Sequence, residues 1–231
     1  MNKEFINFYF SEKQELEELE WIYSEYNFFA KNKYKVYYPK ISEALSRKLI
    51  DNPHSSENKK LLKNEYIKIY SKENKIYKKT LATVSQNWKK IEVNFFSSLE
   101  ELTHFDKKVF ACFISRYGPG GSYYPPDKIS IRAVMEKKQD ILQANESIAH
   151  EIVHLSIYAL AEKFELGFEN TERLVDLILT KTPISNSLKN PSMQGFGDEQ
   201  LDILFGLYPN DLATMLEEFS KFRSVKLNEK F

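Results

Sequence analysis

The chain has 231 residues, enough for one large domain or for one domain with an extension. Its 33 basic and 33 acidic residues cancel, so the overall charge gives no reason to expect attraction to nucleic acids or membranes. The single cysteine, Cys112, excludes an intrachain disulfide and a cysteine-rich zinc module.

The N-terminal segment carries acidic residues before any long apolar run, and it lacks the pattern of a secretory signal peptide. No stretch approaches the roughly 18 consecutive apolar residues that a membrane-spanning helix needs. We therefore expect a cytoplasmic protein with no membrane partner. Secretion by a route that uses no such signal is the alternative.

The first 117 residues contain no glycine, which favours uninterrupted helices in this part of the chain. Residues 11–30 begin with a serine followed by acidic residues, a common start for a helix. Residues 41–50 and 57–80 are also expected to be helical. Residues 1–85 are therefore predicted to form a mainly helical N-terminal region.

The pattern changes after this region. Residues 91–96 alternate in polarity and are predicted to form a strand, with Ile91, Val93 and Phe95 on one face. Residues 98–106 are expected to form a short helix.

Two more strands are predicted, at 109–116 and 128–133. Between them, residues 117–127 hold three of the seven glycines and three of the eight prolines, and are expected to form a loop.

Helices are predicted at 140–163, at 170–180 and at 209–223, with a turn near Gly167 and a loop over 182–198. Helices, a small sheet and further helices follow one another along the chain, which predicts an α+β fold. We expect two parts, the helical region over 1–85 and a second domain over 86–231.

Residues 150–154 read His-Glu-Ile-Val-His, an H-E-x-x-H motif on the predicted helix 140–163. Residues four apart project from the same side of a helix, so His150 and His154 can bind one metal ion. Glu151 is close enough to address a water molecule on that ion. The alternative is a pair of core histidines that bind no metal.

A catalytic zinc ion needs a third protein ligand and an open position for water. Glu172 follows His154 by 18 residues, on a predicted helix that can return antiparallel to the first. Asp176 comes one turn later, where it can accept a hydrogen bond from a ligand imidazole. Glu169 and Glu165 are rival ligands.

The motif HEIVH, followed on a second helix by the glutamate and aspartate of TERLVD, resembles the gluzincin group of zinc metallopeptidases over roughly 90–180. The resemblance implies a zincin-like fold, with a small mixed sheet and active-site helices. It also implies Zn²⁺ bound by His150, His154 and Glu172, with Glu151 as general base and Asp176 orienting a histidine.

In this group, the edge strand of the small sheet pairs with an extended peptide substrate. Residues 128–133 stand where that edge strand is expected, which gives Ser130 a role in substrate binding. The glycine-rich loop places Gly120 and Gly121 beside the cleft. Candidate donors for the transition state are three tyrosines of this loop, Tyr117, Tyr123 and Tyr124.

Residues 59–90 contain ten lysines interleaved with four large aromatic residues, Tyr66, Tyr70, Tyr77 and Trp88. Such a segment can follow a nucleic acid strand or bind an acidic protein. A solvated helix face with its aromatic residues turned inward is the favoured interpretation, and no nucleic acid partner is expected.

The motif and the resemblance predict a zinc-dependent metallopeptidase that acts on a peptide or protein substrate. The alternative is a non-catalytic metal-binding module on the same fold, with the N-terminal helices as its protein-binding surface.

Overall fold

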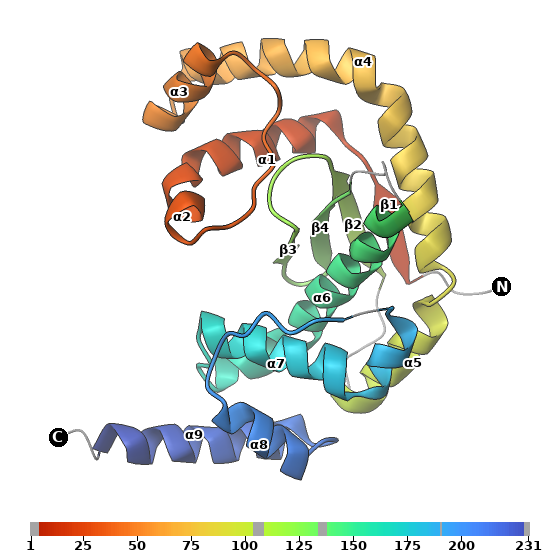
Figure 1. Ribbon diagram of the computed structural model, residues 1–231, viewed down its shortest axis with the longest axis vertical. Helices are drawn as coiled ribbons and strands as arrows, with labels where there is room; N and C mark the ends of the chain where they lie inside the picture. The colour runs from red at the N-terminus through yellow and green to blue at the C-terminus, as the bar shows by residue number, and fades with distance from the viewer. Residues whose placement is uncertain (1–4, 104–108, 134–137, 190, 229–231) are drawn as a thin grey trace.

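The structure is a computed structural model that describes residues 5–103, 109–133, 138–189 and 191–228 (Figure 1). In chain order its elements are β1 Ile6–Tyr9, α1 Glu12–Ser24, α2 Tyr26–Lys31, α3 Glu43–Asp51, α4 Ser56–Trp88, α5 Glu92–Thr103, β2 Phe110–Ser115, β3 Gly121–Tyr124, β4 Lys128–Arg132, α6 Lys138–Lys163, α7 Phe168–Lys181, the 3-10 helix η1 Pro183–Ser187, α8 Gln200–Leu207 and α9 Leu212–Asn228. Helices surround a small mixed sheet, which confirms the predicted α+β class.

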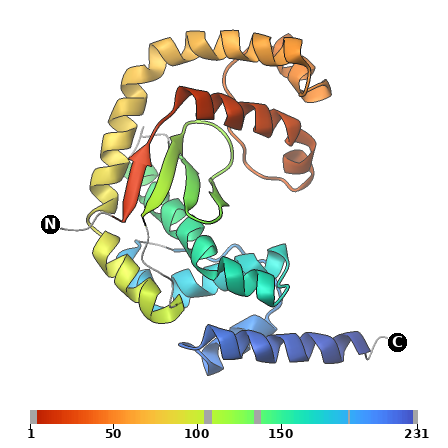
Figure 2. The same cartoon turned by 180° about the vertical axis from the view of Figure 1, so that it is seen from behind.

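The sheet has the strand order β1-β2-β4-β3. β1, β2 and β4 run parallel, and β3 pairs antiparallel with β4 at the edge, in the register Gly121↔Ile131. Helix α6 crosses one face of the sheet and contacts β3 and β4, as the opposite views of Figures 1 and 2 show. The sheet therefore supports the helix that carries the H-E-x-x-H motif.

The N-terminal helices begin where the sequence predicts. Ser11, Ser42 and Ser55 precede α1, α3 and α4, and each hydroxyl accepts a hydrogen bond from a backbone N–H of the first turn, at 3.2, 3.3 and 3.4 Å. These bonds satisfy N–H groups that have no partner within the helix. The predicted helix 11–30 divides at Glu25 into α1 and α2.

The strand predicted at 91–96 is wrong, because this segment opens helix α5. Phe95, Phe96, Leu99 and Leu102 are buried, and their spacing is that of one helix face. Val93, which the strand would have placed beside Phe95, is 60% exposed. The helical spacing of the buried residues across the whole of α5 therefore decides the structure, and the alternation of polarity over 91–96 does not. Residues 104–106 of the predicted helix 98–106 lie outside the described residues.

Four elements had no counterpart in the prediction, namely β1, β3, η1 and α8. β1 and β3 have four residues each, too few for a clear alternation of polarity. β3 also lies inside the segment 117–127 that was expected to be a loop.

The buried apolar side chains form two clusters. One contains Leu19, Ile22 and Tyr66 and lies among the N-terminal helices. The other contains Ile6, Trp88 and most of the buried residues after them, and it surrounds the sheet. Helix α4 contributes to both clusters, so the two parts of the molecule share a single long helix. The boundary predicted near residue 85 falls inside this helix.

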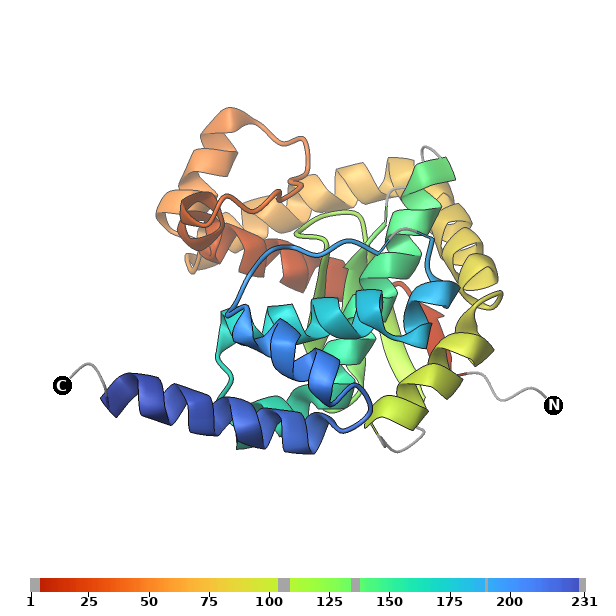
Figure 3. The same cartoon turned by 60° about the horizontal axis from the view of Figure 1, so that its bottom comes forward.

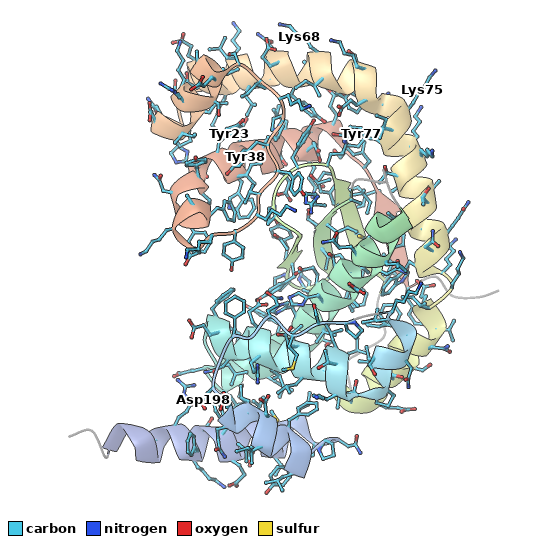
Figure 4. All side chains as sticks on the ribbon, viewed as in Figure 1. Tyr23, Tyr38, Lys68, Lys75, Tyr77 and Asp198 are labelled. Atoms are coloured by element: carbon cyan, nitrogen blue, oxygen red, sulfur yellow. The ribbon has the colours of Figure 1, made fainter. Side chains whose placement is uncertain are left out.

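The basic segment 59–90 coincides with α4, which arches over the molecule. Nine of its ten lysines are exposed, while Tyr66, Tyr77 and Trp88 are buried. Figure 4 shows Lys68 and Lys75 pointing outward from the arch and Tyr77 pointing inward. This geometry is the one expected for a solvated helix face. That no nucleic acid binds there stays a prediction.

Helix α8 packs against α7 and α9 packs against α8, at the end of the molecule away from α1–α3 (Figure 3). The Arg173 guanidinium of α7 makes a two-point ion pair with the Asp202 carboxylate of α8. No helix of the described residues is both long enough and apolar enough to cross a membrane.

A buried carboxylate joins the two parts of the molecule. Glu15 of α1 is fully buried, and its Oε1 accepts hydrogen bonds from the Tyr77 hydroxyl of α4 at 3.0 Å and from the Arg116 backbone N–H at 3.1 Å. Burial raises the pKa of Glu15 to about 7, although the bonds from Arg116 and Tyr77 oppose this shift.

This pKa predicts that the folded chain loses stability as the pH rises. The folded state holds the Glu15 proton up to about pH 7, whereas an unfolded chain releases it near the ordinary value of 4.5. The free energy of unfolding should therefore fall between about pH 5 and pH 8, and Glu15→Gln should remove roughly 3 kcal/mol of that fall. Urea unfolding at both pH values measures it. Glu17→Gln, an exposed change on the same helix, is the control. An equal fall in the free energy of unfolding between the two pH values for the wild type, Glu15→Gln and Glu17→Gln would contradict the prediction.

Candidate metal centre

Helix α6 holds the first two residues of the site. Ile148, Ala149, Ile152 and Val153 are fully buried, so this segment of α6 is fixed by the core. His150 and His154 project from the same side one turn apart, and their Nε2 atoms lie 3.0 Å from each other. The two imidazoles thus lie side by side on one side of the helix, as predicted.

Helix α7 brings the third residue. Gly167, with φ of 72°, ends the turn after α6 in a conformation that favours glycine, and α7 then runs back along α6. The Glu172 carboxylate places Oε2 3.2 Å from His150 Nε2 and Oε1 3.1 Å from His154 Nε2. The rival acids Glu165 and Glu169 are exposed.

The geometry fits a divalent ion such as zinc. His150, His154 and Glu172 each offer a ligand atom in one compact group. In a tetrahedral zinc site, donors about 2.0–2.2 Å from the ion stand about 3.3 Å apart. The two imidazole nitrogens are 3.0 Å apart and each lies 3.1–3.2 Å from its nearer Glu172 oxygen, while one ligand atom from each of the three residues lies within 4.8 Å of the others. Two imidazoles and one carboxylate leave one corner for water.

The charges of the three groups are linked. Burial alone would raise the pKa of Glu172, but hydrogen bonds to His150 and His154 lower it to about 2. Burial lowers the pKa of His154. Burial acts in the same direction on His150, but the Glu172 bond and the charge of Glu151 outweigh it and raise its pKa. The site therefore holds a permanent carboxylate charge that attracts a cation.

Glu151 lies beside the cluster without joining it. Its side chain is buried, and burial raises its pKa to about 7, partly opposed by His150. A carboxyl group that titrates near neutrality can both accept and return a proton there. Strand β3 packs directly on it, because a Cβ atom added to Gly121 would lie 2.4 Å from Glu151 Oε1. Gly121 therefore allows the strand and the carboxyl group to meet.

Tyr123 of β3 contacts His154, a candidate metal ligand, directly. Its ring stacks on the His154 imidazole, with centroids 4.5 Å apart and planes 9° from parallel. The His154 Nδ1 atom is buried and has no hydrogen-bond partner among the described residues. Tyr123 therefore packs against the face of the His154 ring, while Nδ1 makes no hydrogen bond among the described residues.

Asp176 is on the same face of α7 as Glu172, as predicted. Its charge helps to raise the pKa of His150. The Gln194 backbone N–H donates a hydrogen bond to Asp176 Oδ2, at 2.5 Å. The Gln194 side chain also donates to Glu172 Oε2, at 3.4 Å. Gln194 therefore braces both acids, and its place in a predicted loop gave no sign of this.

The cluster opens into a cleft of about 710 Å³. Of the residues predicted to bind substrate or act on it, Gly120, Gly121, Tyr123 and Tyr124 line this cleft. Trp21, Tyr34 and Lys35 of the N-terminal region also line it. More than 110 residues separate them from the motif, so the sequence contains no local signal for their position.

Two predicted site residues lie elsewhere. Tyr117 packs against the N-terminal apolar cluster, where its hydroxyl donates to Glu73 at 3.3 Å. Ser130 is buried in β4, and β4 pairs with β2 on one side and β3 on the other. The prediction that 128–133 forms the substrate edge is therefore wrong, and the edge strand beside the cluster is β3.

Comparison of the chain with protein-family models, with curated proteins and with solved structures finds no match.

The contact between Gly121 and Glu151 predicts that a methyl group at position 121 is costly. Gly121→Ala should lower the free energy of unfolding by about 1–3 kcal/mol, as for other overpacked sites. Gly120→Ala is the matched control, because a Cβ atom there meets nothing within 4 Å. Urea unfolding of both variants measures the difference. Equal stabilities would show that strand and carboxyl group are not in tight contact.

The bond from Gln194 predicts a change in metal affinity. Gln194→Ala should weaken zinc binding about tenfold, the lower end of the range for groups that orient metal ligands, because the bond is long. Competition with a fluorescent chelator measures the affinity. Ser192→Ala, a change at another residue lining the cleft, should leave the affinity unchanged. A loss of the same size in both variants would contradict the specific role of Gln194.

Proposed function

We propose that this chain is a zinc-dependent peptide hydrolase of the gluzincin type. The observation that carries the proposal is the convergence of His150 Nε2, His154 Nε2 and the Glu172 carboxylate within 3.2 Å, beside Glu151 and open to a cleft. His150, His154 and Glu172 are the proposed ligands. When bound there, zinc would lower the pKa of a water molecule and polarise the carbonyl of the scissile peptide bond.

Glu151 is the proposed general base. Its pKa of about 7 lets it take a proton from the attacking water and then deliver that proton to the leaving amine. Strand β3 holds the carboxyl group at Gly121. The Tyr123 ring stacks on His154, and its hydroxyl stays a proposed donor to the transition state.

The free edge of β3 is the proposed binding site for the peptide backbone. The Arg132 N–H bonds to the Gly120 carbonyl, and in antiparallel pairing the bonding positions alternate. Together with the register of β3 and β4 this directs the N–H and C=O groups of Gly121 and Tyr123 away from β4. An extended peptide can add to this edge as a further strand.

Elemental analysis and peptide digestion test the proposal together. The purified protein should contain one zinc ion per chain, and His150→Ala and Glu172→Gln should lose it. Glu151→Gln should keep the ion and lose about 10²–10⁴-fold in peptide cleavage, because only the proton transfer is removed. Glu169→Gln, on the exposed side of α7, is the control.

Two results would contradict the proposal. A wild-type protein without zinc would exclude the metal site. A zinc-loaded protein that cleaves no member of a random peptide library, and binds a protein partner instead, would favour the non-catalytic module.

A further inference from the structure

The cleft has a second wall, made by the N-terminal region. Trp21, Tyr34 and Lys35 line the same cleft as His150 and Glu172. These residues lie outside the segment 90–180 that resembles gluzincins. The resemblance to gluzincins therefore implies nothing about this wall.

The wall is attached to the sheet next to the metal cluster. Tyr37 and Gly118 exchange two backbone hydrogen bonds, at 3.0 and 2.8 Å. The Arg132 guanidinium lies 3.8 Å from the centre of the Tyr37 ring. The Tyr124 hydroxyl of β3 donates to Glu18 of α1, at 3.1 Å. The wall and the free edge of β3 therefore keep a fixed relation to each other.

Two aromatic rings of the wall are exposed, yet packing holds them in place. Trp21 is 38% exposed and Tyr34 is 37% exposed. Trp21 packs edge-on against Phe29 at 5.4 Å, and Tyr34 stacks on Phe28 at 5.9 Å. Rings fixed in this way have little side-chain entropy left to lose, which favours binding of an apolar group.

Tyr34 lines the same cleft as the cluster residues His154 and Glu172. Burial raises the pKa of its hydroxyl, and the negative charge of Glu172 raises it further. Phe168, 58% exposed, lines the cleft from α7. A peptide lying along β3 at the metal cluster therefore lies next to the aromatic wall.

We propose that Trp21 and Tyr34 form a recognition site for a large apolar or aromatic side chain of the bound peptide. This inference rests on the proposed function for the course of the peptide backbone. It assigns the N-terminal helical region to substrate selection, and it makes the peptide's residue at the wall the main determinant of specificity.

Intrinsic fluorescence tests the wall without any catalysis. The chain has two tryptophans, and Trp88 is fully buried, so Trp21 is the one that a ligand in the cleft can reach. Zinc-loaded Glu151→Gln protein is titrated with two pools of blocked octapeptides that lack tryptophan. One pool is otherwise random, and the other also lacks Phe, Tyr, Leu, Ile and Met.

The random pool should change the Trp21 emission and bind at least about tenfold more tightly than the second pool. Adding Tyr34→Ala should bring the two affinities within about threefold of each other, whereas Tyr34→Phe should preserve the difference because the ring remains. Ile67→Ala, an exposed apolar change on α4 outside the cleft, is the control. Equal affinity for both pools, or a preference that survives Tyr34→Ala, overturns the inference.

Cleavage by the wild-type protein separates this inference from the proposed function. Cleavage of both pools with equal efficiency would refute the aromatic wall and leave the hydrolase in place. Selective binding of the random pool without any cleavage would refute the hydrolase and support the wall as a peptide-binding surface. Selective cleavage next to large apolar residues, lost in Trp21→Ala and Tyr34→Ala, supports both.

Discussion

The shared Glu172 carboxylate is the contact on which the rest of the site depends. Each of its oxygens faces one imidazole, at 3.1 and 3.2 Å, so one side chain of α7 fixes the position of two side chains of α6. A buried carboxylate is costly unless it is paired. Here the pairing keeps it charged, with a pKa of about 2. The apolar packing of α6 on α7 thus brings a fixed negative charge to two nitrogen donors.

The surroundings of His154 favour the neutral form that the proposed metal ion would need. The neighbouring charges favour the proton on His150, whereas burial favours neutral His154. A neutral imidazole that accepts at Nε2 carries its proton on Nδ1. That form has a lone pair at Nε2 for the proposed metal ion, whereas the form that donates from Nε2 to Glu172 Oε1 does not. Tyr123 keeps the ring in that orientation by stacking on it.

The local chemistry of the site could be predicted from sequence, because it depends on spacing along helices. Four-residue spacing brings His150 to His154, and a short turn returns the chain so that Glu172 meets both. The choice of Glu172 over Glu169 follows from which side of α7 is buried, and Glu165 is exposed in the turn before α7. The predicted α+β class needed only the order of the elements along the chain.

The surroundings of the site could not be predicted in the same way. The edge strand β3 has four residues within a glycine- and proline-rich segment, so its pairing, not its sequence, makes it a strand. The expected edge, 128–133, became an inner strand because β3 folds back on it. The bond from Gln194 to Glu172 depends on the path of a loop, which no periodicity encodes.

The position of the N-terminal region follows from α4. This helix places Tyr66 in one apolar cluster and Trp88 in the other, so the two clusters cannot move independently without bending or breaking it. The bonds from Tyr77 and Arg116 to buried Glu15 add a polar connection between α1, α4 and the end of β2. Breaking that connection would leave a carboxyl group buried without its donors, which is costly. The N-terminal helices are thus held beside His150, His154 and Glu172 as a fixed wall. A mobile lid would need fewer buried contacts at this junction.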